Sequence, residues 1–411
     1  MNNLKIPELL VPANNLNVLE YAVNYGADAV YVGGKHFNLR SIRGNFTISD
    51  LRKGLKYAHK GNVKVYLTLN SFVHEDEIDE LEDYMDSLAG LDLDAIIVSD
   101  PGLISLAKKK LPGINIHIST QANTTNSLSV DMAESLGARR VNLARELSYK
   151  SIKDIIKKSG TEVEIFVHGA MCISYSGRCM LSKYMSGRDA NKGRCAHSCR
   201  WKYYLMEEER SNLFFPIEQD KEGTYIYNSR DLCLLPVLDK IVSLRPDSIK
   251  LEGRMKTESY VSLVTWVYRK ALDIIKEDKF DKKSKDMLIK ELDKASHRNF
   301  TTGFMFAKDN RELEDNDNVG YIKKYDFIGT PERPQRRNGP PAIMVRNQFS
   351  RGDNIDILQP LSDPIIRKAE EILKLPNMEQ IETANPNDRV VIKGIDELDP
   401  FSILRKKAEK K

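Results

Sequence analysis

The sequence is poor in cysteine and has no long apolar run. Five cysteines in 411 residues are too few for a disulfide framework. There is no stretch of about 18 apolar residues, which a membrane-spanning helix would need. The first residues also lack the basic start and apolar stretch of a signal peptide. We therefore expect a cytoplasmic protein without a membrane partner.

A strong charge of either sign is also missing. The 63 Lys and Arg against 59 Asp and Glu give a formal net charge of +4, which is too small to indicate nucleic-acid binding by itself. With 41% hydrophobic and 30% charged residues, the composition is that of an ordinary globular protein. The length is two or three times that of a usual domain, so we expect more than one domain.

Short aliphatic runs alternate with amphipathic stretches over residues 1–280, which is typical of parallel α/β folds. The predicted strands are Glu8–Val11, Ala29–Val32, Val63–Leu69, Ala95–Val98, Ile114–Ser119, Arg140–Leu143, Val163–Val167 and Ser248–Leu251. The predicted helices are Leu16–Tyr25, Ile48–His59, Glu75–Leu88, Gly102–Lys110, Ser127–Leu136, Tyr149–Lys158 and Glu258–Ile275. Eight such strands fit a (βα)8, TIM-barrel-like catalytic domain. A doubly wound open sheet is the alternative, because the sequence does not give the strand order.

Three further segments complete the predicted organisation. Residues 172–245 form a cysteine-rich insertion between the last two strands, and the highly charged residues 281–316 form a linker or helical region. Short β-rich runs separated by Gly, Pro and Asn predict a small β-barrel domain at residues 317–411. The basic run at residues 405–411 predicts a solvated tail.

Polar side chains follow several of the predicted strands. In a barrel the carboxyl ends of the strands meet at one mouth, where barrel enzymes have their active sites. The candidates are Asn70, Gln121, Arg145, His168, Glu252, Arg254 and Lys256. One such residue often only caps the next helix, but their recurrence predicts a lined pocket.

Four cysteines lie within 28 positions, as Cys172, Cys179, Cys195 and Cys199, with the spacing C-x6-C-x15-C-x3-C. Four thiols in one insertion of a cytoplasmic chain indicate a metal site, since reducing conditions disfavour disulfides. Zinc sites usually have two tight hooks, so the six-residue first gap favours a [4Fe–4S] cluster, with zinc as the alternative metal. His197 could replace a cysteine ligand, and Cys233, in an apolar run, suits a core position.

The segment from residue 164 to 182, EIFVHGAMCISYSGRCMLS, resembles the signature of peptidase family U32, often labelled collagenase-like proteases. Further matches are ELLVPA at residues 8–13, GADAVYVG at 26–33, STQAN at 119–123, NSRDL at 228–232 and KLEGRMK at 250–256. The resemblance extends over nearly the whole chain. Its C-terminal part looks like the small β domain of the tRNA-modifying branch.

The resemblance implies an oxygen-independent tRNA hydroxylase that forms 5-hydroxyuridine at the wobble position, with prephenate as hydroxyl donor. It also implies a [4Fe–4S] cluster held by Cys172, Cys179, Cys195 and Cys199. Some relatives use a cysteine farther along the chain, which makes Cys233 an alternative to Cys199.

A dicarboxylate donor needs cationic partners, and guanidinium groups bind carboxylates with two parallel hydrogen bonds. The predicted substrate-binding residues are Asn70, Gln121, Arg145, Arg254 and Lys256. His168 and Glu252 are the candidate acid–base groups.

Two basic segments predict contacts with a tRNA anticodon loop. Arg200, Trp201 and Lys202 interleave cations with a ring directly after the fourth cysteine, and Arg336 and Arg337 lie in the predicted β domain. A strand under the cluster and a solvated turn explain the two segments equally well.

Two other functions stay open, a peptidase and a zinc-stabilised RNA-binding protein. The sequence gives the peptidase little support, since no nucleophile motif stands out and the H-E-x-x-H-like start at His74 lacks its second histidine. The oligomeric state cannot be read from the sequence.

Overall fold

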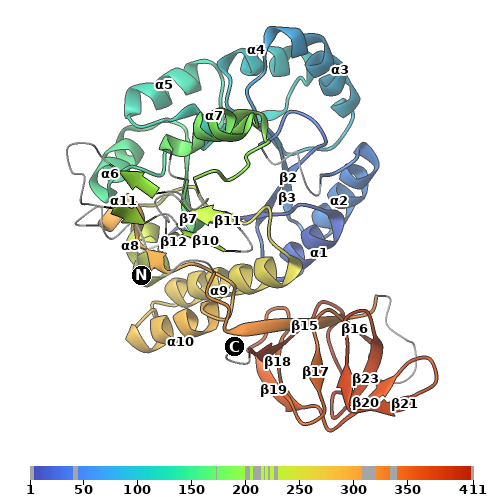
Figure 1. Ribbon diagram of the computed structural model, residues 1–411. Coiled ribbons are helices and arrows are strands. Elements are labelled where there is room, and N and C mark those ends of the chain that lie inside the picture. Colours follow the sequence, from blue (N-terminus) through green and yellow to red (C-terminus); the bar gives the residue numbers. More distant parts are fainter. Residues whose placement is uncertain are drawn as a thin grey trace.

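The computed structural model describes residues 4–39, 45–172, 174–199, 204–206, 214–216, 218–220, 223–225, 230–307, 321–333 and 340–408. A barrel domain and a C-terminal β domain lie side by side (Figure 1). None of the described helices combines the length and the apolar character that crossing a bilayer would need.

The barrel consists of eight parallel strands in a closed ring. They are β1 (Glu8–Pro12), β2 (Ala29–Gly33), β3 (Lys64–Leu69), β4 (Ala95–Val98), β5 (Asn115–Ile118), β6 (Arg140–Asn142), β7 (Glu162–Ala170) and β13 (Ser248–Leu251). Each strand pairs with the next along the chain, and β13 pairs with both β7 and β1. This closure confirms the predicted (βα)8 barrel and excludes the open sheet.

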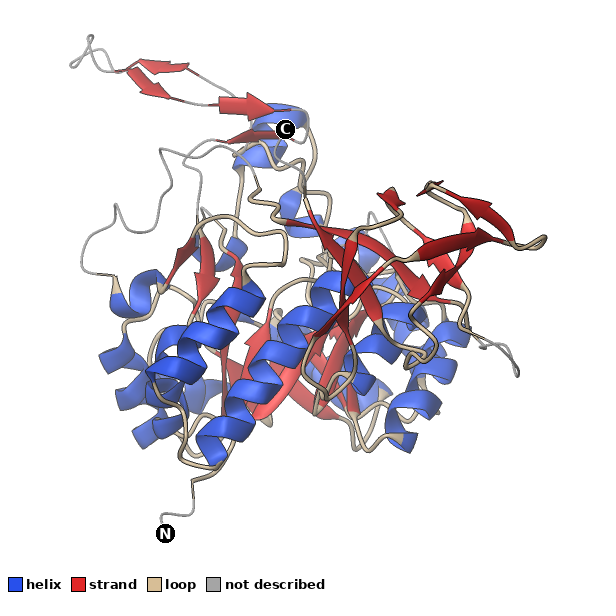
Figure 2. Cartoon of the chain, turned by 90° about the horizontal axis from the view of Figure 1, so that it is seen from below, coloured by secondary structure: helices blue, strands red, loops and turns tan. Residues whose placement is uncertain are grey.

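Helices surround the strands (Figure 2). They are α1 (Leu16–Asn24), α2 (Ile48–Lys60), α3 (Ile78–Leu88), α4 (Pro101–Lys110), α5 (Ser127–Ser135), α6 (Tyr149–Lys158), α8 (Leu238–Ser243) and α9 (Glu258–Lys276). Polar residues at the strand-to-helix turns start several of them. Thr47 and Asp50 form a reciprocal capping box at α2, and Asn126 and Ser148 cap α5 and α6.

The cysteine-rich insertion joins the barrel through one additional strand. Its elements are η3 (Tyr175–Gly177), α7 (Leu181–Ser186), η4 (Ala190–Lys192), β8 (Tyr204–Met206), β9 (Phe214–Pro216), β10 (Glu218–Asp220), β11 (Gly223–Tyr225) and β12 (Asp231–Cys233). Strand β12 runs antiparallel to β7, and β14 (Phe300–Thr301) pairs parallel to β12. Both short strands escape the sequence analysis because two or three residues carry no periodicity.

The charged segment 281–316 belongs to the barrel body in its described part. It contains α10 (Lys282–Leu292), β14 and α11 (Gly303–Phe306). Leu288 and Leu292 of α10 are fully buried in the same hydrophobic core as α9. The segment therefore packs as a helix on the barrel instead of spanning two domains as a linker.

The C-terminal domain is an antiparallel sheet, which confirms the predicted β domain. Its strands are β15 (Tyr325–Pro331), β16 (Ile343–Val345), β18 (Asn354–Leu358), β19 (Ile365–Lys368), β20 (Glu371–Lys374), β21 (Glu379–Ile381), β23 (Arg389–Lys393) and β24 (Ile403–Lys407). Their order is β19-β18-β24-β15-β16-β23-β20-β21. The short strands β17 (Phe349–Ser350) and β22 (Thr383–Ala384) pair with each other.

The solvated tail predicted at residues 405–411 is wrong for its described part. Residues 403–407 form β24, which lies between β18 and β15. Arg405 is buried, and its charge is compensated by ion pairs with the carboxylates of Glu291 in α10 and Asp356 in β18. At the same seam the Tyr25 hydroxyl lies 2.9 Å from the carbonyl oxygens of Leu358 and Phe401.

Candidate active site at the barrel mouth

A narrow cavity of about 90 Å³ lies at the carboxyl ends of the barrel strands. Its polar lining residues include Thr68, Asn70, Ser119, Gln121, Asn142, Arg145, Lys250, Glu252 and Arg254. Five of the seven residues predicted for the mouth thus come together, from the ends of four different strands. His168 and Lys256 do not line the cavity.

Arg254 follows β13 and is buried beside the end of β2. Its guanidinium donates to Thr68 Oγ1 at 2.8 Å and to Asn38 Oδ1. A side chain at Gly33 would place its Cβ 2.6 Å from the Arg254 Nη2 atom. Glycine at the end of β2 is therefore required for the guanidinium to reach the cavity.

Lys250 lines the cavity and Glu164 lies beside it, and the sequence analysis missed both. Lys250 Nζ is 2.9 Å from Glu164 Oε1 and 4.5 Å from the centroid of the Tyr31 ring. Both side chains are about 95% buried or more. Side chains alternate between the two faces of β13, and this alternation is the signal in the sequence. Ile249 and Leu251 face outward, so Lys250 between them faces the lumen.

Glu252 and Arg145 complete the rim. The Tyr31 hydroxyl lies 3.1 Å from Glu252 Oε2 and 3.0 Å from the Leu251 carbonyl oxygen. Arg145 donates to the Ala170 carbonyl at 3.1 Å, and its guanidinium carbon lies 5.5 Å from the Phe166 ring centroid. The rim thus offers a carboxylate beside two guanidinium groups.

His168 faces the core behind the barrel wall. Between Phe166 and His168, strand β7 has one residue more than β13, so that His168 lies opposite the outward-facing Leu251. Its ring contacts Tyr268 and Phe300, and burial lowers the pKa of His168 to about 3. The bulge therefore explains why a histidine predicted for the mouth is a neutral core residue.

Lys256 lies beyond the cavity. Its Nζ is 4.1 Å from the ring centroid of Tyr321 and 5.0 Å from that of Tyr260, so it packs between two aromatic rings. The RNA-binding residues predicted from the sequence lie outside the described residues. They are Arg200, Trp201, Lys202, Arg336 and Arg337.

The four clustered cysteines lie in a segment, residues 172–199, that is tied to the loops around the mouth. Ser176 donates from its backbone nitrogen and hydroxyl to the Glu146 carboxylate, at 2.6 and 2.7 Å. Arg178 Nε donates to the Gln121 carbonyl at 2.8 Å, and the Phe72 amide donates to the Asn191 carbonyl at 3.0 Å. Contacts after β3, β5 and β6 thus hold the segment over the mouth, where Figure 1 shows α7 inside the ring of barrel helices.

All five cysteines are free thiols. The backbone of His197 is left-handed, with φ of 59°, and its N–H donates to Cys195 Sγ at 3.4 Å. Hydrogen bonds to cysteine sulfurs are a recurrent feature of iron–sulfur sites. The donor set and this bond fit a metal–thiolate site, and the side chain of His197 is exposed.

The donor set of four thiols suits either candidate metal. Zinc would take the four thiolates tetrahedrally, and a [4Fe–4S] cluster would take one thiolate on each iron. Over the described residues, a compact group of other metal-ligating side chains consists of His74, Asp76 and Glu77, of which His74 and Asp76 are exposed and Glu77 is half-buried.

Cys233 lies apart from these four, in the barrel core. It is in β12 opposite His168, and only 3% of it is exposed. Burial raises the pKa of its thiol to about 12. Without a metal this cysteine is a protonated core residue.

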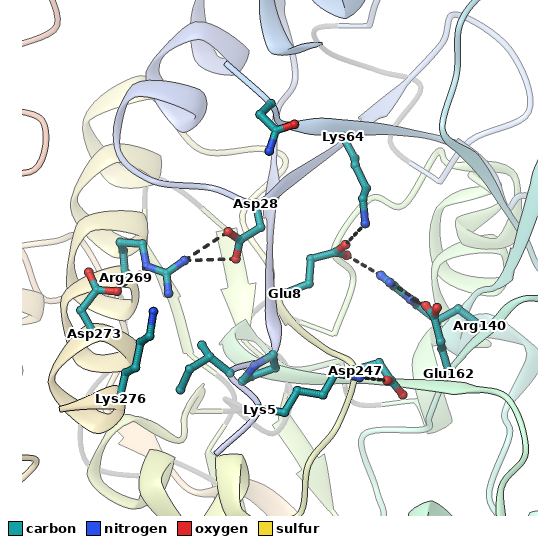
Figure 3. A pocket seen from close by; sticks show the side chains of 13 residues that line it. Lys5, Glu8, Asp28, Lys64, Arg140, Glu162, Asp247, Arg269, Asp273 and Lys276 are labelled. Carbon is teal, nitrogen blue, oxygen red and sulfur yellow. Dashed lines mark hydrogen bonds and ion pairs between the residues drawn. The ribbon is translucent and has the colours of Figure 1, made fainter. Parts of the chain in front are cut away.

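A larger cavity of about 740 Å³ opens at the other end of the barrel, where the strands begin (Figure 3). Most of its charges are mutually paired, as in Lys5–Asp247 at 2.7 Å and Arg269–Asp28 at 3.1 Å. Glu8 contacts Arg140 and Lys64. Burial alone would raise the pKa of Glu8, but these two cations outweigh it and hold the pKa below its usual value.

From this end an ionic chain continues through the barrel lumen. Arg140 lies between Glu8 and Glu164, and its Nη1 atom is 3.5 Å from Glu164 Oε2. Glu164 in turn contacts Lys250 at the mouth. Barrel interiors are usually filled by layers of branched apolar side chains. Here buried charges connect the two ends, and each depends on its neighbours for compensation.

The sequence matches Peptidase family U32 over residues 14–315 and the Peptidase family U32 C-terminal domain over residues 323–405. The boundary between the two matches, residues 316–322, falls between the barrel body and the β domain described above. Together the matches include both structural domains.

Three named relatives are similar to this chain over most of its length. The tRNA hydroxylation protein P1 of Bacillus subtilis is 35% identical, covering 98% of this chain and 95% of its own. An uncharacterized protease of Methanocaldococcus jannaschii is 36% identical over 94% of both chains. The 23S rRNA 5-hydroxycytidine C2501 synthase of Escherichia coli is 29% identical, covering 85% of this chain and 52% of its own.

Proposed function

This chain belongs to peptidase family U32, and we propose that it is an RNA-modifying enzyme that hydroxylates the wobble uridine of tRNA to 5-hydroxyuridine. The observation that carries the proposal is the anchored cysteine segment above a mouth lined by Arg145, Lys250 and Arg254. The names of the relatives from B. subtilis and E. coli support hydroxylation of RNA as the reaction class.

The reaction requires a co-substrate that gives up oxygen. The base exchanges its C5–H bond for a C5–OH bond and loses two electrons, so the donor carbon that releases the hydroxyl must accept them. We propose prephenate as this donor, and Arg254 and Lys250 as the cations that hold its carboxylates. Glu252 lies at the same rim and is placed to accept the proton that leaves C5.

Cys172, Cys179, Cys195 and Cys199 would hold a [4Fe–4S] cluster, which supplies redox or Lewis-acid chemistry when bound. The free thiols and the N–H donated to Cys195 support a metal site, and the six-residue gap between Cys172 and Cys179 favours iron–sulfur over zinc. The bonds of Ser176 and Arg178 to the mouth loops fix the position of this segment relative to the cavity.

A peptidase is the second candidate, because one relative is named a protease. Within the described chain, the one compact set of three or more metal-ligating side chains is His74, Asp76 and Glu77, of which the first two are exposed. It is partly committed elsewhere, since Glu77 contacts Lys192 at 2.8 Å. The cationic mouth pocket favours an anionic substrate instead.

The test combines metal analysis with nucleoside analysis. The chain is purified without oxygen, and its iron, sulfide and zinc are quantified. It is also expressed in cells that lack tRNA hydroxylation, and the digested tRNA is analysed by mass spectrometry. We expect about four irons and four sulfides per chain, and a uridine heavier by one oxygen. One zinc without sulfide, or hydrolysis of casein with unmodified tRNA, would overturn the proposal.

A further inference from the structure

The cysteine segment exposes large apolar side chains on its outer face. Tyr184 is 87% exposed, Met180 66% and Tyr175 50%. Single exposed apolar residues are normal on a protein surface. Here three occur within ten positions of one another, on a segment whose inner side is buried at Ser176 and Ser182.

The orientation of this face is fixed by the inner side of α7. The Ser182 hydroxyl donates to the Arg188 carbonyl at 2.7 Å and accepts from the Ala196 amide at 2.9 Å. Tyr184 is one turn after Met180, and its amide donates to the Met180 carbonyl at 2.9 Å. The two side chains therefore share one helical face, directed away from the buried Ser182.

The segment that carries these apolar side chains is also rich in positive charge. Residues 174–199 contain five Lys and Arg but one carboxylate, Asp189, although the whole chain has a net charge of only +4. Arg188 and Arg194 are exposed, and neither forms an ion pair in the part of the chain that the structure describes. Exposed rings next to uncompensated cations are the features that bind single-stranded nucleic acid, because rings stack on bases and cations contact phosphates.

We propose that Tyr175, Met180, Tyr184, Arg188 and Arg194, the α7 platform, binds unpaired nucleotides of an RNA loop above the barrel mouth. Tyr184 stacks on a base, and the two arginines contact neighbouring phosphates. A lipid surface would require a broad apolar face, whereas three of the six residues of α7 are Ser182, Lys183 and Ser186. The inference rests on the proposed function, since it assumes an RNA substrate.

The experiment measures RNA binding and hydroxylation separately in the full chain. Fluorescence anisotropy follows the binding of a labelled 17-nucleotide anticodon stem-loop and of a fully paired duplex of equal length. We expect Tyr184→Ala to weaken stem-loop binding about 5- to 100-fold, and Tyr184→Phe to retain it, because the ring stacks without its hydroxyl. Leu361→Ala, at an equally exposed residue of the β domain, is the matched control.

The arginines are tested through salt dependence. The double variant Arg188→Gln/Arg194→Gln should lower the slope of log affinity against log salt by about 1.4, since each single-strand phosphate contact contributes about 0.7. Lys157→Gln/Lys158→Gln, in the last turn of α6, removes the same charge at the opposite end of the barrel and should leave the slope unchanged.

The outcomes separate this inference from the proposed function. If wild type hydroxylates tRNA but the platform variants bind the stem-loop as wild type does, the inference fails and the function stands. If wild type neither binds the stem-loop nor modifies tRNA, both fail. If the platform variants instead lose binding to unfolded casein, the surface serves a protein partner and the inference is overturned.

Discussion

The cavity at the amino end of the barrel has a volume of about 740 Å³, and the cavity at the carboxyl end has a volume of about 90 Å³. The two cavities also differ in how their charged side chains are paired. At the amino end, carboxylates and cations pair with one another, as in Arg269–Asp28. At the mouth, Arg145 donates to the carbonyl oxygen of Ala170 and Arg254 donates to Thr68 Oγ1, and both of these acceptors are neutral. The larger cavity thus lies at the end that in barrel enzymes serves stability, and the smaller cavity lies at the end where barrel enzymes have their active sites.

The largest effect should come from the cysteines at the mouth. Cys195→Ala should lose both the bound iron and the hydroxylation of tRNA, because a cluster deprived of one thiolate ligand is no longer held. Iron and sulfide quantitation after anaerobic purification measures the first, and nucleoside analysis the second.

Comparing Cys199→Ser with Cys233→Ser identifies the fourth ligand. We expect Cys199→Ser to lose iron and Cys233→Ser to keep it, since Cys233 is a buried core thiol. The reverse result would show that β12 supplies the ligand and that the insertion rearranges around the cluster.

The next largest effect concerns the ionic chain that joins the two ends. Glu164→Gln should destabilise the fold by about 3–5 kcal/mol, because it leaves the buried cations Arg140 and Lys250 without their shared carboxylate. Urea unfolding measures the change. Glu162→Gln is the control, since its side chain is 26% exposed and its loss should cost less than about 1 kcal/mol. Equal costs for the two variants would show that the lumen tolerates uncompensated charge.

A smaller effect, on kcat/KM, should distinguish a substitution at the mouth from one at the amino end. Arg254→Lys keeps the charge but loses the two parallel hydrogen bonds to a carboxylate, so kcat/KM for the donor should fall about 10- to 100-fold. Lys276→Gln, at the rim of the amino-end cavity, should change it less than about 2-fold. An Arg254→Lys enzyme with a wild-type rate would remove Arg254 from donor binding.

The smallest effect is a pH dependence of stability set by the lumen. Burial, reinforced by Arg140 and Lys250, holds the pKa of His117 well below its usual range. The unfolded imidazole takes up a proton below about pH 6.5 and the folded one does not, so the free energy of unfolding falls as pH falls, by up to about 1.4 kcal/mol per pH unit. His117→Gln should flatten this slope between pH 6.5 and 5. The exposed His74→Gln should keep it.

The sequence predicted the barrel because each strand is a short aliphatic run between capped helices. It failed where the structure depends on pairing between distant segments. Arg405 looks like part of a charged tail, and only the carboxylates of Glu291 and Asp356 allow it to enter a strand. Strand β12 is likewise defined by its pairing with β7, and β14 by its pairing with β12, and not by their own two or three residues.

The site was predictable to the extent that strand ends converge in any barrel. Asn70, Gln121, Arg145, Glu252 and Arg254 meet for that reason. His168 was misplaced because one extra residue in β7 reverses the facing of the side chains that follow, and no single strand shows this. The sequence does not single out Lys250, because only the fold places the Glu164 carboxylate beside its charge inside the lumen.

The ionic chain inside the barrel also limits how the lumen can change over generations. Replacing any one of Glu8, Arg140, Glu164 and Lys250 leaves a buried charge without its partner. Replacing a whole buried pair by apolar residues, in contrast, is often neutral or stabilising. A lineage therefore cannot move from a charged lumen to an apolar one by independent single steps. These four residues should be inherited or lost as a block, and a descendant with an apolar lumen would have had to cross a less stable ancestor.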